Sequence, residues 1–258
     1  MRDSGLQEAI QAAGSVSELA RRIGIAQPSV SNWDRIPAER VAAVETATGV
    51  PRVRLRPDLF EKGAADTEVD PTDAARGHEY ALLATLLSRA PNAALLDSLC
   101  KLRGDPTPLG LAHAALGEAA SKTNVAKSER EFFQLFIGLG RGELLPYASY
   151  YLTGFLNERP LSSLRADLAE LGIERIATNY EPEDHAATLC EIMSGLASGR
   201  FGAPAAAQRD LFTRHMAPWI FRLFSDIENI EGAPFYRTVG TVGRVFMEIE
   251  AEAFTLAD

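Results

Sequence analysis

The sequence contains little cysteine and no long apolar run. Its two cysteines, Cys100 and Cys190, stand far apart in apolar surroundings, which favours reduced thiols in a core over a disulfide. No stretch approaches the roughly 20 apolar residues that a membrane span requires, and the first residues lack the uninterrupted apolar segment of a secretory signal. We therefore expect a cytoplasmic protein without a membrane span.

The sequence also lacks the motifs of common catalytic and metal sites. Glu181, Asp184, His185 and His215 include metal-binding residue types, but no HExxH motif or cysteine pair accompanies them. The glycine-rich stretch 138–142 lacks the preceding strand and the following lysine of a nucleotide-binding loop. We expect no metal, no catalytic residue and no enzymatic activity.

Charge is distributed unevenly along this globular chain of 258 residues, of which 46% are hydrophobic and 24% charged. The formal net charge is −9, yet residues 1–65 hold 9 basic and 8 acidic side chains, so the remainder is strongly acidic. Overall acidity argues against indiscriminate coating of nucleic acid. It remains compatible with a small DNA-reading domain attached to an acidic body.

Helical spacing of apolar residues runs through the chain, and clear strand alternation is missing. Leu82, Leu83, Leu86 and Leu87 fall on one helical face, for example. The segment 61–72 is rich in Gly, Ala, acids and Pro, which is typical of a linker. The sequence predicts an all-α protein, with a small domain over 1–60 and a bundle of about nine helices over 73–258.

The first 60 residues have the pattern of a helix-turn-helix domain. Helices are predicted over 6–13, 15–23, 27–35 and 37–48, with Gly24 in the turn that precedes the third. That third segment is rich in Gln, Ser and Asn, whose side chains can hydrogen-bond base edges or phosphates. A dimer would be needed to read a full site, because one such domain covers a half-site.

This domain resembles the Cro/YdaS-like helix-turn-helix family over residues 4–60. The resemblance is carried by three segments: Val16–Ala20, Ile25–Trp33 and Ile36–Arg40. It implies that polar side chains of the third helix face the major groove and that two arginines contact phosphate: Gln27, Ser29, Ser31, Asn32, Arg35 and Arg40. The alternative is a vestigial domain, because a balance of +1 is low for a phosphate-neutralising surface.

Four ordered elements in the remainder resemble the TorD/DmsD family of redox-enzyme maturation chaperones, over about residues 75–255. They are Phe132–Phe136, Pro146–Leu152, Glu181–His185 and His215–Trp219. The resemblance implies an all-helical cytoplasmic chaperone that binds the twin-arginine signal peptide of a molybdenum-cofactor oxidoreductase. It leaves a weak guanine-nucleotide site open, and no other cofactor is expected.

Acidic groups beside an apolar groove would suit such a peptide, which has a cationic front and an apolar middle. The candidate client-binding residues come from three of the elements: Leu135, Phe136, Pro146, Tyr147, Ser149, Tyr150, Glu181, Pro182, Asp184 and His185. A structural alternative stays open for each group. Phe132, Phe136 and Trp219 could simply be core, and Glu181–His185 could be a capped acidic first turn of a helix.

Two functions of different class follow from this organisation. The chain is either a chaperone with an accessory helix-turn-helix domain, or a DNA-binding transcription regulator whose chaperone-like part senses unexported client. Formate dehydrogenase and dimethyl sulfoxide or trimethylamine N-oxide reductases are all compatible clients. The sequence leaves open whether operator DNA is bound, and whether the protein is a monomer or a dimer.

Overall fold

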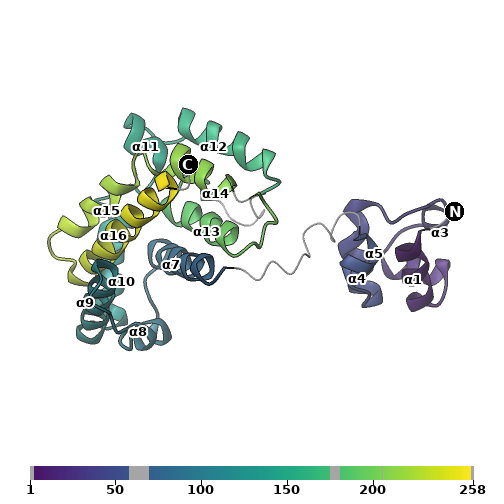
Figure 1. Ribbon diagram of the computed structural model, residues 1–258, viewed down its shortest axis with the longest axis horizontal. Coiled ribbons are helices and arrows are strands. Elements are labelled where there is room, and N and C mark those ends of the chain that lie inside the picture. The colour runs from purple at the N-terminus through teal and green to yellow at the C-terminus, as the bar shows by residue number, and fades with distance from the viewer. Residues whose placement is uncertain (1–2, 58–69, 175–180, 205, 257–258) are drawn as a thin grey trace. The chain divides into compact units, whose positions relative to one another are not determined.

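A computed structural model describes residues 3–57, 70–174, 181–204 and 206–256 of the chain (Figure 1). The chain divides into two compact units, Met1–Glu68 and Val69–Asp258, hereafter the head and the body. The described residues of both units form helices and no strand, so the all-α prediction is confirmed. Most of the predicted linker 61–72 lies outside the described residues, and its last two residues, Pro71 and Thr72, already belong to the first helix of the body.

The head consists of five short α-helices and one 3₁₀ turn: α1 (Ser4–Ala13), α2 (Val16–Arg22), α3 (Gln27–Ser31), η1 (Ala38–Arg40), α4 (Val41–Thr48) and α5 (Arg52–Leu55). Ser15 caps α2, because its Oγ accepts a hydrogen bond from the Glu18 backbone N–H at 3.1 Å. Gly49 ends α4 in the left-handed conformation, with φ of 71°. These start and stop signals act as the sequence predicts.

The third helix is shorter than predicted, ending at Ser31 instead of continuing to residue 35. The Trp33 N–H bonds the Val30 carbonyl at 3.2 Å, which closes a tight final turn. The chain then leaves the helix and inserts Ile36 fully into the core of the head. Tertiary burial therefore overrides the local helical pattern here. The helix α5 was not predicted from the sequence at all.

The body contains ten α-helices in its described part, against about nine predicted. They are α7 (Pro71–Ser88), α8 (Ala93–Leu99), α9 (Pro108–Lys122), α10 (Val125–Phe132), α11 (Ala148–Thr153), α12 (Arg159–Glu170), α13 (Ala186–Ala197), α14 (Ala206–Leu211), α15 (Ile220–Asn229) and α16 (Pro234–Leu256). Two π-helical turns, Phe133–Ile137 and Phe212–Met216, continue α10 and α14. None of the described helices is both long and apolar enough to cross a bilayer.

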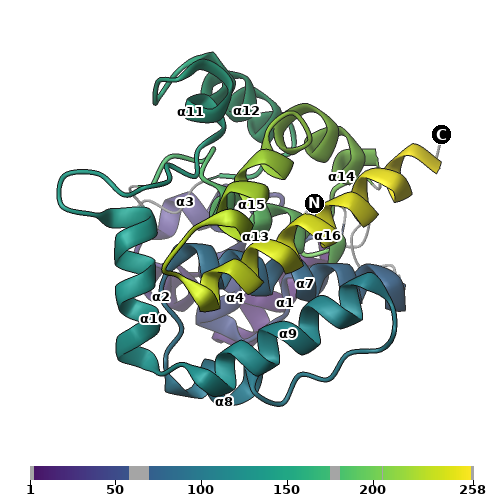
Figure 2. The ribbon, with the colours of Figure 1, turned by 90° about the vertical axis from the view of Figure 1, so that its left-hand side faces the viewer.

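The core of the body forms where α13 packs along α7 and where α16 packs between α15 and α9 (Figure 2). Glycines allow the closest approaches. A Cβ on Gly243 of α16 would lie 2.1 Å from the Phe224 ring of α15, and a Cβ on Gly77 of α7 would touch α13. Because α7 and α13 are held this closely, the side chains along their shared edge have fixed positions.

Two buried carboxylates link helices that lie far apart in the sequence of the body. Glu250 of α16 accepts hydrogen bonds from the Arg76 guanidinium at 2.7 Å, twice, and from the Tyr80 hydroxyl at 2.8 Å. Glu131 of α10 accepts the backbone N–H groups of Phe235 and Tyr236, at 3.0 and 3.1 Å, and so caps α16. Because both acids have hydrogen-bond partners inside the protein, their role is to hold the fold together.

The His215–Trp219 element also serves the architecture. The Trp219 ring is buried, and its Nε1–H donates to the His215 carbonyl at 2.7 Å. The Tyr151 ring of α11 packs on it with 5.4 Å between centroids. The His215 Nε2 lies 2.5 Å from the Asp167 carboxylate on α12. This element therefore holds α11 and α12 in place, in agreement with the core alternative for Trp219.

Candidate functional site

The segments around Tyr147 and His185 meet in the body, although they lie far apart in the sequence. An isolated antiparallel bridge pairs these two residues, and the Ala148 N–H donates to the Asp184 carbonyl at 3.0 Å. Their rings are in edge-to-face contact, with 4.9 Å between centroids and an interplanar angle of 78°. Two of the four sequence elements thus form one structural unit.

Asp184 and His185 each cap a helix within this unit. The Asp184 Oδ2 accepts the Ser149 N–H at 2.8 Å, at the start of α11, where the N-cap residue Tyr147 supplies no side-chain bond. The His185 Nδ1 accepts the Ala187 N–H at 3.1 Å and caps α13. Asp184 is 1% exposed. The capping alternative stated for this motif is therefore what the geometry shows for these two side chains.

Tyr147 and Glu181 form the polar rim of this unit. The Tyr147 hydroxyl donates to the Glu181 carboxylate. Burial, together with this carboxylate, raises the pKa of Tyr147 well above its usual value, so the phenol stays protonated. Glu181 itself is exposed. The hydrogen bond thus holds the Glu181 carboxylate, which is a hydrogen-bond acceptor, in a fixed position.

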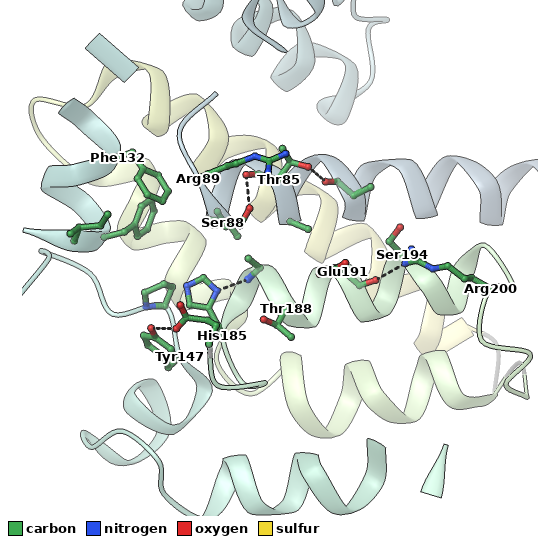
Figure 3. Close-up of a pocket in the computed structure, with 18 residues that line it drawn as sticks. Thr85, Ser88, Arg89, Phe132, Tyr147, His185, Thr188, Glu191, Ser194 and Arg200 are labelled. Atoms are coloured by element: carbon green, nitrogen blue, oxygen red, sulfur yellow. Dashed lines mark hydrogen bonds between the residues drawn. The ribbon is translucent and has the colours of Figure 1, made fainter. Parts of the chain in front are cut away.

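A cavity of about 570 Å³ opens beside this rim (Figure 3). Its walls come from the end of α7, from α10 with the π-helical turn that follows it, and from α13. Figure 3 shows Thr85 and Ser88 of α7, and Arg89 directly after it, across the cavity from Tyr147 and His185. Backbone elements distant in sequence therefore enclose one site, and the site depends on the packing of α13 against α7.

The predicted client-binding residues divide into two groups. Five line this cavity: Phe136, Pro146, Tyr147, Glu181 and His185. The other five do not. Leu135 is buried in the core. Ser149 and Asp184 are buried where the segments around Tyr147 and His185 meet. Pro182 is half-buried in the loop before α13. Tyr150 lines a separate cavity of about 380 Å³ between α11 and α15.

Several lining residues escaped the sequence analysis. Thr188, Glu191 and Ser194 form a polar stripe at three-residue spacing on the otherwise apolar α13, and all three line the cavity. That spacing is a helical-face signal, so the stripe could have been found once 186–197 was taken as a helix. Arg89 and Arg200 also line the cavity, but no pattern in the sequence marks them.

A second cavity of about 400 Å³ adjoins the first, since Thr188, Glu191 and Arg200 line both. Its other walls are largely apolar side chains: Leu168, Ala169, Ile173, Ile192 and Phe201. The Arg200 guanidinium stacks over the Phe201 ring, 5.3 Å from its centroid. We call the two cavities together the α13 groove. One end of it is polar and the other is apolar.

Some carboxylates of the α13 groove form ion pairs within the described part of the chain, and others do not. The Glu183 carboxylate pairs with Arg165 at 2.7 Å. Glu174 and Glu191 are exposed, and neither carboxylate has an ion-pair partner among the described residues. An occupant with positive charge would therefore find two unpaired carboxylates next to the apolar end.

The described residues contain no cluster of three His, Cys, Asp or Glu side chains that could hold a metal ion. Glu181 and Asp184 stand on one loop, but His215 is bound to Asp167 elsewhere in the body. The four residues weighed as metal ligands in the sequence are thus not assembled into one site.

The candidate DNA-contacting side chains of the head lie on or next to α3. Ser29 and Asn32 are exposed, and the Gln27 amide donates to the Ser31 hydroxyl at 2.6 Å. Arg35 lies beyond the end of the helix, with its Nε 3.4 Å from an Asp3 carboxylate oxygen. The polar face of α3 is therefore present. The predicted phosphate contact nearest to it, Arg35, pairs with Asp3.

Other arginines of the head are also engaged by acids. Glu18 binds Arg21 at 2.6 Å and Arg22 at 3.0 Å, and these hydrogen bonds lower the pKa of Glu18 to about 2. Arg52 pairs with Glu45 at 2.7 Å, and Arg54 with Glu8 at 2.6 Å. Arg40 is exposed. Much of the positive charge of the head is thus offset locally by its own carboxylates.

Comparison with known proteins supports the resemblance of both units. Residues 102–225 match the family model described as nitrate reductase delta subunit. Chaperone protein TorD of Vibrio cholerae is 31% identical over 99 residues, which cover 35% of this chain and 45% of that protein. Chaperone protein TorD of Aliivibrio fischeri is 26% identical over 132 residues, or 47% of this chain and 61% of that protein. The body is TorD-like.

The matched part of the TorD-like body contains α10, the π-helical turn and α13, which are three of the elements that enclose the α13 groove. The chain spans about half the length of the curated relatives it matches. Residues 6–63 match the family model described as bacterial toxin YdaS, which supports the resemblance predicted for the head.

Proposed function

We propose that the TorD-like body is a cytoplasmic maturation chaperone that binds the twin-arginine signal peptide of a molybdenum-cofactor oxidoreductase. The relatives that it matches are named chaperones, which supports a binding function without catalysis. The single observation that carries the proposal is the α13 groove, in which unpaired carboxylates adjoin an apolar cavity. A leader peptide has the same order of features, with arginines ahead of an apolar stretch.

Glu191 is the side chain best placed to receive a peptide arginine. It lies where the two cavities meet, is exposed, and has no ion pair among the described residues. Its position beside Ile192 and Phe201 puts a carboxylate within reach of a residue whose neighbours enter the apolar end. An arginine can bind such a carboxylate through two parallel hydrogen bonds.

Titration calorimetry with a synthetic twin-arginine leader from a molybdoenzyme tests this proposal on the full chain. We expect the unaltered protein to bind, and Glu191→Gln to weaken binding about three- to tenfold. A leader with both arginines replaced by glutamine should lose the same factor, and should bind both proteins equally. The matched control is Glu252→Gln, which removes an exposed carboxylate of α16 outside the groove. Equal binding by all three proteins would refute the role of Glu191.

A second function, sequence-specific DNA binding by the head, is favoured by the match to a helix-turn-helix family, by the exposed Ser29 on α3 and by the exposed Asn32 directly after it. In this proposal the TorD-like body senses unexported client, and the head binds or releases operator DNA in response. A binding selection from random duplexes with the full chain, with and without leader peptide, tests it. Enrichment of a repeated half-site supports the regulator, and the absence of any enriched motif at low salt excludes it.

A further inference from the structure

His185 is held in the wall of the α13 groove by a hydrogen bond that uses one specific ring nitrogen. Its Nδ1 accepts the Ala187 N–H at 3.1 Å, which requires a free lone pair on Nδ1. The ring also packs edge-to-face against the Tyr147 ring. The cap and the ring contact together fix both the position and the orientation of the imidazole.

The same hydrogen bond determines the tautomer of His185. Burial lowers its pKa from the ordinary value, although Glu181 and Asp184 act in the opposite direction. The neutral ring therefore prevails at neutral pH. Since Nδ1 is the acceptor, the single proton of that neutral ring resides on Nε2.

The Nε2–H has no hydrogen-bond partner among the described residues. Among the described residues, the fully buried polar side-chain atoms without a hydrogen-bond partner are Thr123 Oγ1, Ser149 Oγ and Asp184 Oδ1. The Nε2 of His185 is not one of them. His185 lines the polar cavity of the groove. A donor with a fixed position therefore opens onto the site, in need of an acceptor from the occupant.

We infer that His185 donates its Nε2–H to a main-chain carbonyl oxygen of the peptide segment that occupies the α13 groove. The inference rests on the proposed peptide-binding function. The neighbouring carboxylates Glu181 and Asp184 disfavour an anionic acceptor at this point, whereas a peptide carbonyl is neutral. Every residue of a peptide carries such a carbonyl, so this bond supplies affinity that is independent of side-chain sequence.

Nitrogen-15 NMR of histidine-labelled full chain tests the tautomer directly. At pH 7.5 the His185 ring should show an unprotonated Nδ1 and a protonated Nε2, and saturating leader peptide should move the Nε2–H signal downfield. The signal is assigned by its loss in His185→Asn, because His78, His113 and His215 also contribute. A proton on Nδ1, or an imidazolium at this pH, would overturn the inference.

His185→Asn separates the donor from the cap. An asparagine side-chain oxygen caps helices well, so α13 should keep its first turn, but the short side chain carries no donor to the place of Nε2. We expect native circular dichroism and about three- to tenfold weaker leader binding. His185→Ala, which loses both roles, should also melt at a lower temperature.

Leader peptides with single amide-to-ester replacements identify the acceptor. An ester weakens the carbonyl oxygen, and one position should cost the unaltered protein affinity while costing His185→Asn none. If no position shows this coupling, or if His185→Asn binds as tightly as the unaltered protein, the inference fails and the proposed function stands. If the unaltered protein binds no leader, the proposed function fails and takes the inference with it.

Discussion

The Asp184 carboxylate caps α11 from a loop that is 35 residues further along the chain, by accepting the Ser149 N–H at 2.8 Å. This bond and the backbone bridge beside it join α11 to the start of α13. One short loop therefore fixes two helix ends, and the same loop presents Glu181 and His185 to the α13 groove. Substitutions within this loop should consequently separate into those that affect stability and those that affect binding.

Asp184→Ala should destabilise the body by about 1–2 kcal/mol, because it leaves the buried Ser149 N–H without its acceptor. Asp184→Asn keeps an acceptor oxygen and should lose less. Glu181→Gln alters an exposed side chain and should leave the melting temperature unchanged while weakening leader binding. Thermal melts of the three variants check this order. A melt of Asp184→Ala that equals the unaltered one would show that the cap contributes nothing.

Two histidines should give the stability of the body opposite pH dependences. The hydrogen bond with Glu79, at 3.0 Å, raises the pKa of His113. Its contribution is therefore complete below about pH 6.5 and is lost as the pH rises through the folded-state pKa. Burial lowers the pKa of His185, so its contribution is complete above about pH 6.5 and is lost as the pH falls towards the folded-state pKa.

Urea denaturation between pH 5 and pH 8 measures both effects. The destabilisation by His113→Gln should be largest at the acidic end, and the destabilisation by His185→Ala, which loses the cap, should be largest at the alkaline end. Parallel profiles for the two variants would contradict the assignment of opposite pKa shifts.

Gly5 of α1 lies against the backbone of α5, and a Cβ added there would stand 2.0 Å from the Leu55 carbonyl oxygen. Because backbone cannot yield as a side-chain tip does, Gly5→Ala should destabilise the head by about 1–3 kcal/mol. The exposed Gln11→Ala on the same helix is the matched control. Calorimetry should show a lower melting temperature for the head alone, with the transition of the body unmoved. Joint movement of both transitions would show that the two units unfold together.

Glu18→Gln should strengthen binding of random duplex DNA at low salt, about two- to fivefold. The substitution releases Arg21 and Arg22 from the carboxylate that holds them at 2.6 and 3.0 Å. Released arginines can neutralise phosphates, so the dependence of affinity on salt should also steepen. Fluorescence anisotropy over a salt series measures both quantities, with Glu252→Gln in the body as the control. Unchanged affinity would place these arginines away from the DNA.

The sequence allowed the local features of the fold to be predicted, since these depend on neighbouring residues. The Ser15 cap, the Gly49 stop and the leucine face of α7 are examples. The end of α3 was missed because the burial of Ile36, a tertiary effect, draws the chain out of the helix. Local signals thus identify helices more reliably than they locate helix ends.

The candidate site was predicted only in part, for a related reason. The motif residues Tyr147, Glu181 and His185 do line one cavity. The roles of Asp184 and Ser149 as cap and capped residue depend on how two loops pair, which no spacing in the sequence reveals. Glu191 and Arg200 lie at the junction of two cavities that exist only once α13 packs on α7.

The buried link between Arg76 and Glu250 has a consequence for synthesis on the ribosome. The two residues are 174 positions apart, so at about 5–20 residues per second Glu250 is made some 9–35 s after Arg76. Throughout that interval the first helix of the body lacks the carboxylate that satisfies Arg76 and Tyr80. The head, whose core uses residues no later than Leu55, can complete its fold in the meantime. Translation thus orders the two units in time, because the head can fold while the body still lacks α16.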